Sequence, residues 1–138
     1  MKSIEQIQDE IIENFNVFDN WVEKYEYLID LGKDLPKIDD EQMVDSNLIK
    51  GCQSRVWLNA TKLNGKIIFT ADSDAIMTKG IIALLINVLS NQSADDISNS
   101  DLYFISKIGL NEQLSATRAN GLSSMIKQMK IYALGLNK

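Results

Sequence analysis

The chain has 138 residues, of which 45% are hydrophobic and 24% charged, and its formal net charge is −5. This length suits a single domain spanning residues 1–138, with a core large enough to fold without disulfides or a bound metal. The acidic balance argues against a nucleic-acid partner, because affinity for a phosphate backbone comes largely from Lys and Arg.

The N-terminal segment predicts a helix over about residues 4–14. Ser3 followed by Gln6 has the spacing of a capping box, and apolar residues then recur at helical spacing. The first ten residues are too acidic for a signal peptide. We therefore expect a cytoplasmic protein.

A second helix is expected shortly afterwards. Asp19 or Asn20 can cap it, an apolar face begins at Trp21, and Gly32 is expected to end it. The polar and acidic residues 33–47 then predict a loop.

Short strands around a tight turn are expected in the middle of the chain. Apolar runs at residues 56–59 and 66–70 flank Asn64-Gly65, a dipeptide whose easy positive φ suits a hairpin turn. Leu48-Ile49 is expected to form a further strand before them. The pattern predicts an antiparallel sheet of about three strands.

Another helix is expected after this sheet. Asp72 and Asp74 are predicted to cap its free amides, and Gly80 within it permits close packing. Its buried stripe is predicted to consist of Met77, Ile81, Leu84 and Val88. The apolar run 81–89 has only about half the length of a membrane span, so no membrane partner is expected.

The C-terminal part predicts short helical turns after Ser90 and then one long helix. The apolar side of that helix is predicted to carry Leu122, Met125, Ile126, Met129 and Ala133. The order of elements predicts an α+β fold, in which a small antiparallel sheet of about three strands is covered by helices on one face.

Cys52 is the single cysteine and lies in a connection between two strand-like runs. The chain has no histidine, which removes the commonest general base, the triads built on it and imidazole ligands. With one thiol, a structural zinc site is nearly excluded as well, and we expect no metal. A lone cysteine is often an inert buried residue, and that alternative stays open on local sequence alone.

A chemical role for Cys52 would need a thiolate, and an ordinary free thiol is only slightly ionised at neutral pH. Lys50, Arg55 and Arg118 are the candidate cations, because a nearby positive charge favours the charged form of the thiol. Gly51 would let the backbone turn tightly beside the sulfur.

Several separated motifs occur in a fixed order along the chain. They are Trp21, Lys24-Tyr25, Leu31-Gly32, Leu35-Pro36, NLIKGCQSRVW at 47–57, ADSDA at 71–75, Lys79-Gly80, Leu114-Ser115 and RANGL at 118–122. In these motifs the chain resembles, from end to end, the SufE family of sulfur acceptors for cysteine desulfurases. The resemblance implies a SufE/IscU-like fold.

The resemblance also implies roles for particular residues. In such proteins the cysteine of the GCQS motif receives persulfide sulfur from a SufS-like cysteine desulfurase, which implies this role for Cys52. Arg118 is then expected near the cysteine loop, as a stabiliser of the thiolate or of the loop. The candidate partner-binding residues are Gly51, Gln53, Ser54, Arg55 and Asp74.

The implied protein stimulates the desulfurase and passes sulfur to an iron–sulfur scaffold of the SufBCD-like kind. Pyridoxal phosphate belongs to the desulfurase, so no cofactor of its own is expected. IscU-type scaffolds have a related fold but use several cysteines and usually a histidine, which this chain lacks. The chain departs from the family at Ala116, where proline is common, and no loss of function is expected because alanine also favours helix.

Two alternatives remain. The protein could be a non-covalent activator of the desulfurase that carries no sulfur, or a hydrolase with a cysteine nucleophile and an acidic base. The interpretation favoured by the motifs is a sulfur-transfer accessory protein rather than a stand-alone enzyme.

Overall fold

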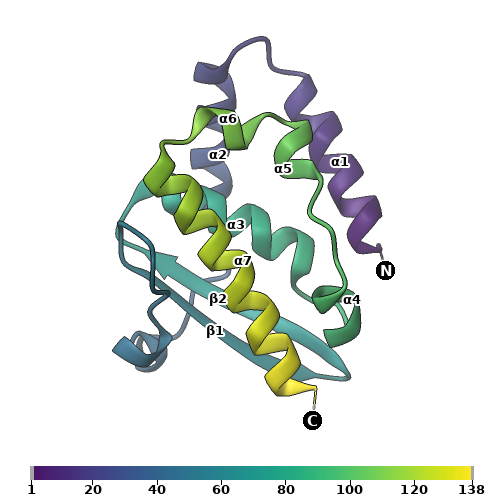
Figure 1. The fold of residues 1–138 in the computed structure, drawn as a ribbon, viewed down its shortest axis with the longest axis vertical. Coiled ribbons are helices and arrows are strands. Elements are labelled where there is room, and N and C mark those ends of the chain that lie inside the picture. Colours follow the sequence, from purple (N-terminus) through teal and green to yellow (C-terminus); the bar gives the residue numbers. More distant parts are fainter. Residues whose placement is uncertain (1, 138) are drawn as a thin grey trace.

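The computed structural model describes residues 2–137, which form an α+β fold with helices packed on one face of a β-hairpin (Figure 1). The helices are α1 (Ile4–Asn16), α2 (Trp21–Lys33), α3 (Ile76–Leu89), α4 (Ala94–Ser98), α5 (Phe104–Lys107), α6 (Leu110–Gln113) and α7 (Ala116–Leu136). The strands are β1 (Val56–Leu63) and β2 (Lys66–Ser73), and two 3-10 turns, η1 (Asp40–Gln42) and η2 (Asp45–Asn47), precede them. The predicted fold class is confirmed.

The sheet is an antiparallel hairpin with its register running from Val56 opposite Ser73 to Leu63 opposite Lys66. Asn64 and Gly65 have φ values of 52° and 79°, as the sequence predicts for a two-residue hairpin turn.

The prediction of about three strands is wrong for the described residues, because the sheet has two strands. Leu48 makes a single bridge to Trp57, and on the other edge Lys37 makes a single bridge to Ala71. The stretch around Leu48 is too short to form a strand, because η2 ends just before it and the chain turns at Gly51, where φ is 91°.

One face of the hairpin is buried under helices. Residues alternate along β2, with Ile67, Phe69 and Ala71 buried. Helix α3 contacts β2, α7 contacts β1, and the two helices contact each other, so both lie over this face (Figure 1). Trp57 lies opposite Asp72 on the other face and is only half-buried.

Helix α3 is the centre of the core, and α2 packs closely along it. Gly80 permits this packing, because a methyl group there would collide with the carbonyl oxygen of Leu28. Gly32 faces the same crossing, where an added Cβ would lie 2.9 Å from the backbone nitrogen of Gly80. The predicted use of Gly80 for close packing is confirmed.

The helix starts are partly as predicted. The capping box of Ser3 and Gln6 is present, and Asn20, not Asp19, caps α2. The predicted caps Asp72 and Asp74 are wrong, since β2 continues through the first of them and α3 begins after Ala75 without a side-chain cap.

Of the predicted apolar side of α7, Leu122, Met125, Met129 and Ala133 are buried, whereas Ile126 is half-buried. Within residues 2–137, no helix combines the length and the apolar character needed to cross a membrane.

Candidate functional site

The GCQS motif forms a short loop closed at its base. The backbone N–H of Ile49 donates to the carbonyl oxygen of Val56 at 2.9 Å, so residues 50–55 form a loop outside the hairpin. Gly51 is in the left-handed region with φ of 91°, and a Cβ on it would lie 2.6 Å from Ser124 Oγ of α7. A side chain here would meet both backbone strain and a steric clash.

The C-terminal end of this loop is held by the junction between β2 and α3. The backbone N–H of Arg55 donates to Asp74 Oδ1 at 3.1 Å, and Ser73 Oγ donates to the carbonyl oxygen of Arg55 at 2.7 Å. The N–H of Asp74 donates to the same carbonyl at 3.3 Å. Asp74 therefore holds the cysteine loop instead of capping a helix.

Cys52 is half-buried against the backbone of α7. Its Sγ donates to the carbonyl oxygen of Gly121 at 3.6 Å, a weak bond typical of a thiol. A Cβ on Gly121 would lie 3.5 Å from this sulfur, so the absence of a side chain at residue 121 leaves space beside the thiol.

The thiol is held in its neutral form. Burial raises the pKa of Cys52 above its ordinary value, because desolvation penalises the thiolate. A carbonyl acceptor also favours the protonated sulfur. The expected lowering of the thiol pKa by Lys50, Arg55 and Arg118 is therefore not found in this conformation.

A cavity of about 270 Å³ opens beside Cys52 and connects three parts of the chain that are distant in sequence. It is lined by Cys52, Gln53, Ser54, Ala75, Thr78, Ile81, Thr117, Arg118, Gly121 and Met125. Arg118 thus borders the same cavity as Cys52, although its side chain is exposed. Its backbone N–H is bound by Ser115 Oγ at 3.3 Å, the cap of α7.

The cavity also contains residues that the sequence analysis did not select. Thr78 is buried, and its hydroxyl donates to Ser54 Oγ at 3.5 Å, which links α3 to the loop. The available signal for Thr78 was its position three and four residues before the apolar Ile81 and Ile82. Gly121 belongs to the RANGL motif, but nothing local distinguishes it from a packing glycine.

The other predicted partner-binding residues lie on the loop surface, where Gln53 and Arg55 are exposed and Ser54 is half-buried. Over residues 2–137, no group of three or more His, Cys, Asp or Glu side chains is arranged to hold a metal ion.

Comparisons with known proteins identify the family of the chain. A family model described as "SufE: Fe-S metabolism associated domain" matches residues 9–133. An uncharacterized SufE-like protein of Rhizobium meliloti (strain 1021) is 39% identical over 133 residues, covering 92% of this chain and 94% of the relative. Another from Rhizobium etli is 39% identical over 127 residues, covering 88% of this chain and 86% of the relative.

A solved structure has the same fold. The solution structure of a hypothetical protein from Thermus thermophilus superposes with a TM-score of 0.78, covering 94% of this chain and 95% of the other, at 17% sequence identity. The fold is thus shared with a chain of very different sequence. The match of the family model to most of the chain, together with relatives at 39% identity, shows that the protein belongs to the SufE family, whose domain is associated with Fe–S metabolism.

Proposed function

We propose that this protein is a sulfur carrier that accepts a persulfide sulfur from a cysteine desulfurase onto Cys52 and delivers it to an iron–sulfur cluster scaffold. The observation that carries the proposal is the single thiol of the chain, presented on a glycine-turned loop beside a cavity that Arg118 also lines. The protein acts as an accessory of the desulfurase, which it stimulates by freeing the desulfurase cysteine for another turnover.

The transfer step is a thiol–persulfide exchange. The Cys52 thiolate attacks the outer sulfur of the desulfurase persulfide, and a new sulfur–sulfur bond forms. The original sulfur–sulfur bond breaks, and its electron pair leaves on the desulfurase cysteine, which then takes up a proton. One sulfane sulfur moves between the proteins, and no external oxidant or reductant is consumed.

Activation of the thiol requires a change from the resting state. The raised pKa and half-burial of Cys52 disfavour attack while the loop rests against Gly121. The bonds from Ile49 to Val56 and from Arg55 to Asp74 lie at the two ends of the loop. The loop can therefore carry Cys52 towards a partner while these anchors and the hairpin remain intact. The same enclosure shelters a persulfide from stray thiols.

Intact mass spectrometry tests this function directly. After incubation with a cysteine desulfurase and free cysteine, the protein should gain sulfur that a thiol reductant removes, and Cys52→Ser should gain none. Equal sulfur gain by the serine variant would refute transfer to Cys52. Full stimulation of the desulfurase by Cys52→Ser, without sulfur gain by the wild type, would favour the non-covalent activator.

A further inference from the structure

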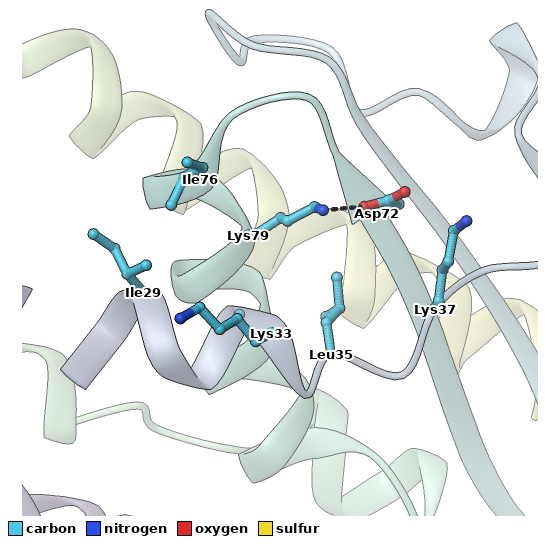
Figure 2. Close-up of a pocket in the computed structure, with 8 residues that line it drawn as sticks. Ile29, Lys33, Leu35, Lys37, Asp72, Ile76 and Lys79 are labelled. Carbon is cyan, nitrogen blue, oxygen red and sulfur yellow. Dashed lines mark ion pairs between the residues drawn. The ribbon is translucent and has the colours of Figure 1, made fainter. Parts of the chain in front are cut away.

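A second cavity lies on the side of α3 that faces α2 and the segment after it (Figure 2). Its volume is about 440 Å³, and Ile29, Leu35 and Ile76 supply its apolar side chains. Ile76 is 65% exposed at the first position of α3. The cavity therefore offers apolar surface to an incoming side chain.

Lysines surround this apolar surface. Lys33, Lys37 and Lys79 line the cavity together with one carboxylate, Asp72 (Figure 2). Lys79 Nζ lies 3.4 Å from Asp72 Oδ1, and that carboxylate is mostly buried, so this pair is part of the wall.

The other two lysines are available to a partner. Lys33 pairs with Asp30 at 3.2 Å and Lys37 with Asp40 at 3.8 Å, but all four side chains are largely exposed. Exposed pairs of this kind contribute little and exchange readily for a better acceptor. The lining of the cavity thus holds three lysines and one carboxylate, and the carboxylates of Asp30 and Asp40 are not among its lining residues.

The position of the cavity connects it to Cys52. Within the first turn of α3 and the residue before it, Ala75 and Thr78 line the cysteine cavity, whereas Ile76 and Lys79 line the second one. The two cavities therefore lie on either side of one helical turn. A protein that covers the first also reaches the second.

We propose that the second cavity docks an acidic segment of the cysteine desulfurase that carries a projecting apolar side chain. The apolar side chain inserts among Ile29, Leu35 and Ile76, and its neighbouring Asp or Glu residues pair with Lys33 and Lys37. This inference rests on the proposed function, because the desulfurase is the partner that must approach Cys52. Docking there orients the desulfurase without touching the thiol, so it sets affinity and leaves the chemical step unchanged.

The test uses charge and polarity changes with matched controls. Ile76→Asp is compared with Leu63→Asp, since Leu63 is 61% exposed at the far end of the hairpin. The double variant Lys33→Glu/Lys37→Glu is compared with Lys62→Glu/Lys107→Glu, which changes the net charge equally at two exposed lysines outside the cavity. Circular dichroism confirms that each variant is folded.

Affinity for the desulfurase is measured by calorimetry at low and high salt, and sulfur transfer is followed over a range of carrier concentrations. Both cavity variants should bind at least about tenfold more weakly, and the lysine variant should lose most of its salt dependence. Their KM for transfer should rise while kcat stays unchanged, and the control variants should stay within about twofold of the wild type.

Equal weakening by cavity and control variants would overturn the docking proposal, as would normal binding by the cavity variants. If sedimentation shows that the wild type self-associates, and the cavity variants abolish only that, the occupant is a second copy of this chain and the proposal is wrong. If the wild type binds the desulfurase through this cavity but never gains sulfur, docking stands and the proposed carrier function fails.

Discussion

Substitution of Gly51 by alanine tests whether the cysteine loop depends on glycine. The φ of 91° lies in a region where a Cβ costs about 1–2 kcal/mol. The added methyl group would also lie 2.6 Å from Ser124 Oγ, well inside van der Waals contact. Because a serine side chain can move, this clash adds less to the free-energy cost of the substitution than a collision with backbone atoms would. We expect Gly51→Ala to lower the free energy of unfolding by about 2 kcal/mol in all.

Two further variants separate the strain from the clash. Gly65 has a φ of 79° and no atom within 4 Å of an added Cβ, so Gly65→Ala should show the backbone strain alone. Ser124→Ala removes the clashing oxygen and leaves only a Cβ 3.5 Å from the Gly51 methyl group. In that background the cost of Gly51→Ala should fall by roughly 0.5–1 kcal/mol.

Urea unfolding followed by circular dichroism measures all of these free energies, with the double variant closing the cycle. If Gly51→Ala costs the same with and without the Ser124 hydroxyl, the loop does not rest against α7 as described. If Gly51→Ala costs nothing while Gly65→Ala is destabilising, the left-handed conformation of the loop is refuted.

The remaining predictions concern the thiol and its cavity. Because burial raises the pKa of Cys52, its alkylation rate should rise with pH at a higher midpoint than the rate of a free cysteine. Burial of the thiol should also stabilise the fold less as the pH rises through that raised pKa. An alkylation midpoint at or below that of free cysteine would contradict the raised pKa. Arg118→Ala should impair sulfur transfer without unfolding the protein. Rescue by Arg118→Lys would indicate that the charge matters, and failure of both variants would indicate that the planar hydrogen-bonding group matters. Normal transfer by both variants would show that Arg118 has no role in transfer. Gly121→Ala should leave the protein with a free thiol stable, since the added Cβ fits 3.5 Å from Sγ, but it should speed the loss of a bound persulfide to reductant. Mass spectrometry measures the persulfide lifetime, with Gly135→Ala as the control. An unchanged lifetime in Gly121→Ala would contradict this prediction.

Local sequence signals predicted much of this fold because their physical causes are local. The capping box at Ser3 and the hairpin turn at Asn64 depend on residues only one to three positions apart. The predicted strand at Leu48 failed because its length is limited by the neighbouring turns, which a run of apolar residues does not reveal. Asp74 was assigned to the wrong partner, because the amide it accepts from belongs to Arg55, which is 19 positions away.

The candidate site was less accessible to local reasoning. The motif resemblance selected Cys52 and Arg118, but their common cavity exists only because α7 packs against the cysteine loop. The raised thiol pKa likewise follows from burial, which no residue adjacent in sequence determines. The cations near Cys52 in the sequence therefore led to a wrong prediction of the ionisation of its thiol at rest.

The bond between Ile49 and Val56 also sets how far the sulfur can travel. Cys52 is three residues beyond Ile49 and four before Val56, so even a fully extended loop would keep it within roughly 10 Å of the Ile49 anchor. On such a short loop, Cys52 can reach only an acceptor that lies close to the protein. For the proposed sulfur carrier, the donor and acceptor sulfurs would each have to come within this radius of the same edge of the hairpin. Delivery would then be restricted to proteins whose reactive sulfur can reach that position.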